Sequence, residues 1–207
     1  MLLVLLYPGV SMAIEEPRYK VESKSDQFEI RSYGDIVVAE TVVDADFSEA
    51  GNRAFRILAS YIFGNNKTKT KIEMTAPVTQ VTAATKAEKK EKSEKIEMTA
   101  PVSQVKSSGG YTVQFTMPEK FNLENLPIPI DSRVQLRKVP GRRVAVYSYS
   151  GSWSESRYQE KLNDFRESLK KANLKTEGEP VLARFNSPFQ LWFLRRNEIW
   201  LDLAKAQ

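Results

Sequence analysis

Two β-type segments followed by an amphipathic helix form the first clear pattern in the chain. Residues 28–31 and 35–43 are rich in β-branched and aromatic side chains, and Tyr33-Gly34 between them predicts a hairpin turn. Over residues 47–63 the apolar positions instead recur every three or four residues, which is typical of one buried helix face. These positions are Phe47, Ala50, Ala54, Leu58 and Tyr61. The run Gly64-Asn65-Asn66 ends the helix.

The same pattern returns at a constant offset of 106 residues. The matched positions are Phe28 with Val134, Ile30 with Leu136, Arg31 with Arg137, Val38-Ala39 with Val144-Ala145, and Phe47-Ser48-Glu49 with Trp153-Ser154-Glu155. A second helix is predicted over residues 154–174, with Tyr158, Leu162, Phe165 and Leu169 on one stripe. Further strands are predicted around Met74 and Met98 and over residues 111–117, 180–185 and 197–203.

The chain therefore reads as two β-β-α-β-β halves, over about residues 18–117 and 131–203, in one domain spanning residues 14–207. Chance similarity of two hairpin-helix units is the alternative. Half-buried strands with amphipathic helices favour the α+β class. The two halves can curve into one distorted antiparallel β-barrel flanked by two α-helices, with a ligand pocket between sheet and helix.

A ten-residue sequence occurs twice, as KIEMTAPVTQ at residues 71–80 and KIEMTAPVSQ at residues 95–104. We expect one copy to form an edge strand that turns at its proline, because proline cannot donate to a sheet ladder. Which copy does so is open. Residues 81–94 between them are polar and charged, which predicts a mobile loop. Met74 and Met98 are expected to fill gaps in the core.

The composition removes whole classes of chemistry. The 207 residues include no cysteine and no histidine, so a Ser-His-Asp triad, a thiolate site and a histidine-ligated iron are impossible. The net charge of +5 comes largely from the lysine-rich stretch at residues 86–95, which is better explained as a solvated loop than as a nucleic-acid surface. No nucleic acid and no metal site is therefore expected.

The first thirteen residues, MLLVLLYPGVSMA, start with an apolar run and end in Ser11-Met12-Ala13. Small residues at those last positions are typical of a signal-peptidase site, so residues 1–13 are predicted to be an export signal, and the mature protein to be periplasmic. An apolar N-terminal tail is the alternative. No later run approaches the roughly 20 apolar residues of a membrane span.

Three motifs occur in an order that resembles the SOUL haem-binding protein family. They are Lys-Ile-Glu-Met-Thr-Ala-Pro-Val, the helical Gly51-Asn52-Arg53-Ala54-Phe55 and the late Arg195-Arg196-Asn197-Glu198-Ile199-Trp200. The similarity covers roughly residues 17–203, and the start near Ile14 resembles exported bacterial members. The resemblance implies a distorted barrel with two flanking helices, and haem or a related tetrapyrrole bound in an apolar groove beside the first helix.

Matching by motif places Asn52, Phe55 and Ala59 on the haem-facing side of that helix. Asn52 stands where family members can carry a basic residue, so the resemblance moves the role of propionate partner to Arg53 or Arg56. Because the chain has no histidine, iron would be bare, water-ligated, or held by Met, Tyr or Lys. The protein is expected to act as a non-enzymatic monomer with haem as its bound ligand.

Competing interpretations remain for the function and for single residues. The groove can instead take another small apolar ligand or a protein segment. An enzyme is disfavoured because Glu40, Glu73 and Lys71 show no catalytic spacing. Core packing is the preferred role for Phe55, Ala59 and Ile62 taken singly, whereas Arg53 and Arg56 can equally be solvated. Residues 195–198 are expected to have a structural role, as a charged edge before an apolar strand that closes the barrel. Trp153 and Trp192 are expected at core or rim positions.

Overall fold

The computed structural model describes residues 14–68, 92–186 and 189–204. The predicted signal segment, the first KIEMTAPV copy with Lys71, Glu73 and Met74, and residues 81–91 of the predicted loop lie outside the described residues. In chain order the elements are β1 (Tyr19–Lys24), β2 (Glu29–Tyr33), β3 (Ile36–Val43), α1 (Phe47–Ile62), β4 (Asn66–Lys67), β5 (Val102–Ser107), β6 (Gly110–Thr116), β7 (Ile128–Pro129), β8 (Gln135–Val139), β9 (Arg142–Tyr149), α2 (Glu155–Lys171), β10 (Thr176–Arg184), the 3-10 turn η1 (Trp192–Leu194) and β11 (Asn197–Leu203).

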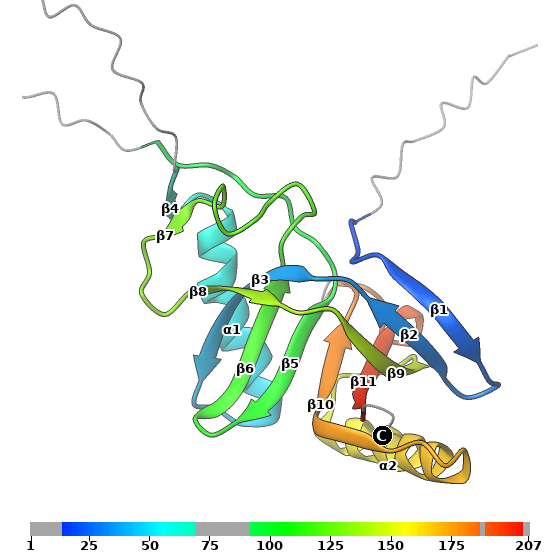
Figure 1. Cartoon of the computed structure of the whole chain (residues 1–207). Coiled ribbons are helices and arrows are strands. Elements are labelled where there is room, and N and C mark those ends of the chain that lie inside the picture. The colour runs from blue at the N-terminus through cyan, green and yellow to red at the C-terminus, as the bar shows by residue number, and fades with distance from the viewer. Residues whose placement is uncertain (1–13, 69–91, 187–188, 205–207) are drawn as a thin grey trace, which may run out of the picture.

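Nine strands form one curled antiparallel sheet in the order β1-β2-β9-β11-β10-β5-β6-β3-β8, with β4 and β7 paired separately (Figure 1). From β2 to β8 this order is symmetric about its central pair, β10 and β5, which come from different halves. The pair β2–β9 corresponds to β8–β3, and the pair β9–β11 corresponds to β3–β6. The predicted α+β fold, a distorted barrel built from two β-β-α-β-β halves with two helices, is confirmed. The sheet curls into a half-barrel.

The predicted hairpin of the first two strands is wrong. β2 pairs with β1 and β9, whereas β3 pairs with β6 and β8, so the two strands separate after Tyr33. The equivalent turn of the second half packs against this one: the Gly141 amide donates to Asp35 Oδ1 at 2.8 Å, and a Cβ on Gly141 would lie 2.8 Å from the Tyr33 carbonyl oxygen. β2 of the first half therefore pairs with β9 of the second half, and β8 of the second half pairs with β3 of the first.

The second KIEMTAPV copy is not an edge strand. Residues 93–101 form no strand, and β5 begins only after the proline, at Val102, between β10 and β6 in the middle of the sheet. Pro101 precedes the ladder, where its missing N–H costs no sheet hydrogen bond. Ile96 of this segment is buried and its amide donates to the Ile62 carbonyl at 2.7 Å, but Met98 is 39% exposed, so its expected core role is wrong.

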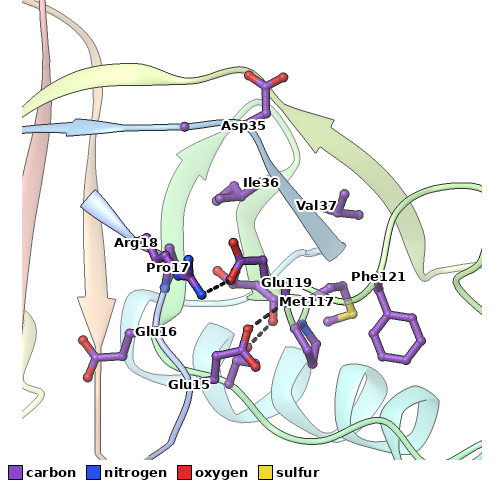
Figure 2. Close-up of a pocket in the computed structure, with 14 residues that line it drawn as sticks. Glu15, Glu16, Pro17, Arg18, Asp35, Ile36, Val37, Met117, Glu119 and Phe121 are labelled. Atoms are coloured by element: carbon purple, nitrogen blue, oxygen red, sulfur yellow. Dashed lines mark hydrogen bonds and ion pairs between the residues drawn. The ribbon is translucent and has the colours of Figure 1, made fainter. Parts of the chain in front are cut away.

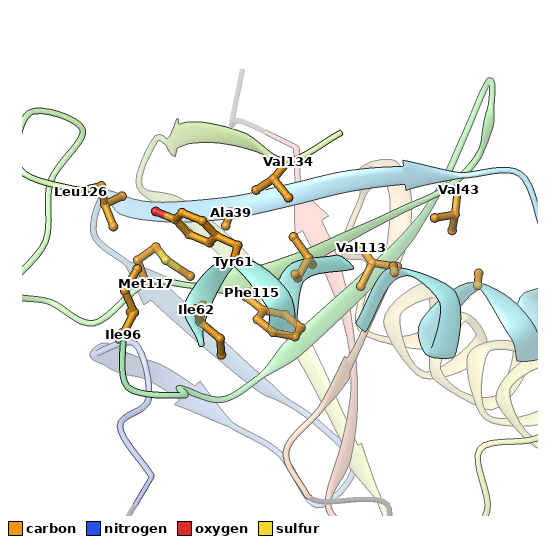
Figure 3. Close-up of a cluster of buried hydrophobic side chains, with 13 residues drawn as sticks. Ala39, Val43, Tyr61, Ile62, Ile96, Val113, Phe115, Met117, Leu126 and Val134 are labelled. Carbon is orange, nitrogen blue, oxygen red and sulfur yellow. The ribbon is translucent and has the colours of Figure 1, made fainter. Parts of the chain in front are cut away.

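Each helix covers its own half of the sheet through a separate apolar cluster. Under α1, Leu58, Tyr61 and Ile62 pack against side chains of β3 and β6, among them Ala39 and Phe115 (Figure 3). Under α2, the predicted stripe packs on β9, β10 and β11; its members are Tyr158, Leu162, Phe165 and Leu169. No helix in the described parts of the chain is long and apolar enough to cross a membrane.

Asn197 and Glu198, at the end of the predicted charged edge over residues 195–198, are buried in the middle of the sheet. β11 lies between β9 and β10, and Asn197 and Glu198 are 0% and 1% exposed. The Glu198 carboxylate accepts hydrogen bonds from Arg31 Nη1 at 3.0 Å and from Trp200 Nε1 at 2.7 Å. The predicted charged edge is therefore wrong, because a central strand can carry a carboxylate only where donors surround it.

Candidate ligand-binding groove

A groove opens beside α1, where the helix flank faces the start of β5 and the end of β10. Its volume is about 370 Å³, within the range of about 300–1,000 Å³ that is typical of small-molecule sites. Its lining residues are Gly51, Asn52, Phe55, Arg56, Val102, Gln104, Trp153, Arg184 and Asn186. Most of the apolar wall is aromatic, and the polar groups are amides and guanidinium groups, so the groove combines a flat apolar surface with positive charge.

Three of the five predicted site residues line this groove and two do not. Asn52, Phe55 and Arg56 lie three and four residues apart and share one helix flank. Arg53 does not line the groove: it pairs with Glu49 at 2.5 Å, donates to the Asp44 carbonyl at 3.3 Å, and lines a neighbouring hollow that Arg56 also reaches. Ala59 is 7% exposed and belongs to the buried part of α1. The arrangement thus favours Arg56 over Arg53 as the basic residue of the groove.

Phe55 joins the groove to the core. Its ring is partly buried and lies 5.4 Å, centroid to centroid, from the ring of Phe115 under α1. The position therefore serves both expected roles, because one edge of the ring packs inward while the residue also lines the groove. Ile62 is fully buried and has only the core role.

The far wall of the groove comes from residues that helix periodicity could not indicate. Trp153 precedes α2, and its Nε1 donates to the buried Asn197 Oδ1 at 2.8 Å, which fixes the indole. Arg195 stacks on that indole at 4.2 Å from its centroid, and Arg184 lies 5.2 Å from it. Trp153 was expected at the core or the rim, and it forms a groove wall.

An exposed apolar loop starts and ends at this wall. The Arg196 amide donates to Asn186 Oδ1 at 2.5 Å, and Phe185 donates back to the Arg196 carbonyl at 3.2 Å, so the two ends of the loop are tied together. Within the loop, Leu191, Trp192, Phe193 and Leu194 are each more than half exposed. Trp192 is therefore not a core residue. Large exposed apolar patches commonly mark binding surfaces.

A second hollow, of about 250 Å³, lies where the first described residues meet β3 and the end of β6 (Figure 2). Its charged groups are already paired: Arg18 bonds Glu119 at 2.9 Å, and the Glu119 amide donates to Glu15 Oε1 at 2.6 Å. Figure 2 shows these side chains directed toward one another across the hollow. Because Arg18 already has a carboxylate partner and Glu15 already accepts a backbone amide, this hollow offers a ligand less than the groove does.

The described residues hold no cluster that could bind a metal ion, and the candidate acid Glu40 is engaged in an ion pair. No group of three or more acidic side chains there could hold a metal ion. Glu40, one of the candidate acids, accepts two hydrogen bonds from Arg137, at 2.9 Å each, and one from Gln114 at 2.8 Å. Burial raises the pKa of Glu40, but these hydrogen bonds outweigh burial and hold the pKa below its ordinary value. Glu40 therefore serves an ion pair between β3 and β8.

Solved structures share the fold at low sequence identity. The C-terminal domain of EcmrR matches with a TM-score of 0.57 and 10% identity, over 87% of this chain and 98% of that one. A hydrolase from Listeria innocua matches with a TM-score of 0.53 and 11% identity, over 88% and 94%. At such identities the similarity shows the fold alone.

Sequence comparisons are more specific. The family model described as SOUL heme-binding protein matches residues 14–91 and 85–202. Heme-binding protein 2 of Homo sapiens is 30% identical over 200 residues, which cover 93% of this chain and 88% of that protein. Heme-binding protein 2 of Mus musculus is 30% identical over 196 residues, or 91% and 86%. The chain therefore belongs to the SOUL heme-binding protein family.

Proposed function

We propose that the groove beside α1 binds haem or a related tetrapyrrole without catalysing a reaction. The observation that carries this proposal is a groove with aromatic walls, Phe55 on one side and Trp153 on the other, in a member of a haem-binding family. A flat apolar macrocycle suits such walls, because stacking and solvent exclusion need no directional bond. Each 100 Å² of apolar surface removed from water contributes about 2.5 kcal/mol before association costs.

The residues that line the groove suit contact with the macrocycle better than ligation of its metal. The chain contains no histidine or cysteine, and none of the described residues that line the groove is a methionine, tyrosine or lysine. A bound haem would supply an iron centre to the protein. The groove's own residues contribute apolar contact and positive charge, so affinity should depend mainly on the ring and its substituents.

The exposed loop gives the proposed ligand a second apolar surface. Trp192 and its apolar neighbours are anchored at Asn186 and Arg195, and both anchors lie at the groove. A macrocycle that extends beyond the groove would cover part of this loop. Burying such side chains would offset the cost of exposing them in the free protein.

An absorbance titration with haemin, and a fluorescence titration with metal-free protoporphyrin, test the proposal. Because no groove residue is a natural iron ligand, the two dissociation constants should agree within about tenfold, or 1.4 kcal/mol. Phe55→Ala and Arg56→Ala should weaken both ligands. Arg53→Ala is the matched control, because it removes an arginine of the same helix that does not line the groove and should change neither constant.

Two outcomes would contradict the proposal. The first is a far weaker constant for the metal-free ring, which would mean that an iron ligand dominates. The second is no Soret shift at micromolar haemin together with thermal stabilisation by other hydrophobic compounds. That result would favour the alternative of a site for a different apolar ligand or a protein segment.

We also propose that the protein is exported to the periplasm and acts there as a monomer. The apolar run and the Ser11-Met12-Ala13 ending support export. Expression in a bacterial host, followed by fractionation and N-terminal sequencing, should give a periplasmic chain that starts at Ile14. Light scattering on that material should give the mass of one chain. A cytoplasmic chain that retains Met1, or the mass of a dimer, would contradict the respective statement.

A further inference from the structure

Arg184, at the end of β10, lies in the groove without an acidic partner. Its Nη2 donates to Gln104 Oε1 at 3.3 Å, and its Nε is buried without any hydrogen bond. Among the described residues, no carboxylate lies within ion-pair distance of this guanidinium. Arg31, the arginine buried inside the sheet, has two such partners, Glu29 at 2.8 Å and Glu198 at 3.0 Å.

The environment of Arg184 disfavours its charge. Burial lowers the pKa of the guanidinium to about 10; the nearby Tyr149 opposes this shift, and the positive charge of Arg195 adds to it. A buried cation without a counter-ion costs folding free energy, so a protein usually pairs it or replaces it. Strongly disfavoured charges of this kind are concentrated at functional sites.

The surroundings hold the guanidinium in place. Gly51 of α1 leaves room for it, since a Cβ there would lie only 2.5 Å from Arg184 Nη1. The Gln104 side chain is oriented by a hydrogen bond from its Nε2 to the Phe47 carbonyl at 3.0 Å, which directs its Oε1 to Arg184. The site is therefore organised before any ligand enters.

We propose that Arg184 is an anion-recognition residue that makes the groove select planar apolar ligands carrying a carboxylate. This inference rests on the proposed function and specifies the ligand that the groove takes. Nη1 makes no hydrogen bond to the described residues and is available to a carboxylate that enters between Gly51 and Trp153. Arg56 at the same groove provides a second cation for a ligand with two acidic arms.

The test compares protoporphyrin IX with its diamide, which has the same ring and no negative charge. The wild-type protein should bind the diacid about ten- to a hundredfold more tightly, as expected for a hydrogen bond to a charged group. Arg184→Gln should remove most of the preference for the diacid, except the part that Arg56 provides, and should leave diamide binding unchanged. Arg184→Lys should recover part of the preference, and Arg53→Gln should leave it intact.

Thermal unfolding supplies a readout that separates recognition from a structural role. Removal of a partly buried charge without an ion-pair partner should leave the melting temperature of Arg184→Gln unchanged or raise it, whereas a structural arginine would leave the variant less stable. Equal wild-type affinity for diacid and diamide, or equal loss of both in Arg184→Gln, would overturn this inference and leave the proposed function standing. Failure of the wild-type protein to bind either ring would contradict both the inference about Arg184 and the proposed function.

Discussion

Replacing Gly51 by alanine should separate ligand recognition from stability. Gly51 lies inside α1 and is buried, so alanine should stabilise the helix by about 1 kcal/mol. The new Cβ would lie 2.5 Å from Arg184 Nη1, whereas ordinary contact begins at 3.4 Å, so the guanidinium must move by about 1 Å. That movement breaks its hydrogen bond to Gln104, which is worth about 0.5–1.5 kcal/mol.

The two contributions nearly cancel, because the atom that must move is the end of a flexible side chain. We expect the unfolding free energy of Gly51→Ala to lie within about 0.5 kcal/mol of the wild-type value in urea denaturation. Affinity for protoporphyrin IX should nevertheless fall about tenfold, because the displaced guanidinium no longer meets the carboxylate.

Gly110→Ala is the control for the denaturation assay. Gly110 has φ of +109°, and a Cβ there would meet the backbone oxygen of Val43 at 2.3 Å, which cannot move as a side-chain end can. This variant should lose more than about 2 kcal/mol. Unchanged porphyrin affinity in Gly51→Ala, or a stability loss as large as that of Gly110→Ala, would refute the reasoning about Arg184.

Three further predictions concern the sheet and the loop. Arg31→Met should destabilise the protein by about 3–5 kcal/mol in urea, because buried Glu198 loses its nearer cation and keeps only Arg196, at 3.8 Å. Arg31→Met/Glu198→Leu should recover most of this; no recovery would exclude a charge effect. Arg137→Met should cost about 1 kcal/mol or less at pH 7. Folding lowers the pKa of Glu40, so its ion pair with Arg137 stabilises the folded protein fully at pH values above the ordinary pKa of 4.5. This stabilisation is lost as the pH falls through the lowered pKa of the folded state. The difference between wild type and Arg137→Met should therefore vanish in acid, and a difference independent of pH would contradict it. Trp192→Ser should weaken porphyrin binding but leave the melting temperature nearly unchanged; a large fall in that temperature would instead show a packing role.

Hydrophobic periodicity predicted the elements that bury one face and missed those that do not. Both helices were found nearly to their ends, because each has an apolar stripe over an apolar cluster. β1 was missed because all six of its residues are exposed, so its sequence carries no pattern of a buried face. The hairpin was wrong because Tyr33-Gly34 indicates a turn but not the partner of each strand.

The sequence predicted the α1 wall of the groove but not the wall opposite it. Asn52, Phe55 and Arg56 follow from helix spacing once the motif places the ligand beside α1. The opposite wall requires knowledge that β10 pairs with β5, since this pairing brings Arg184 opposite Val102. That contact joins residues 82 positions apart, and no local pattern contains it.

The duplication explains why the groove lies beside α1. Phe47 and Trp153 are counterparts in the two halves, but their rings meet different neighbours. Phe47 stacks on Tyr158 of α2 at 4.9 Å and contacts Tyr111 at 5.9 Å, and these rings line a hollow beside the second helix of only about 190 Å³. Trp153 instead faces Gly51 and Asn52, which are too small to reach it, and the guanidinium of Arg184 occupies part of the gap. Each half thus has a hollow at its helix flank, and the one beside α1, with small side chains opposite Trp153, is about twice as large.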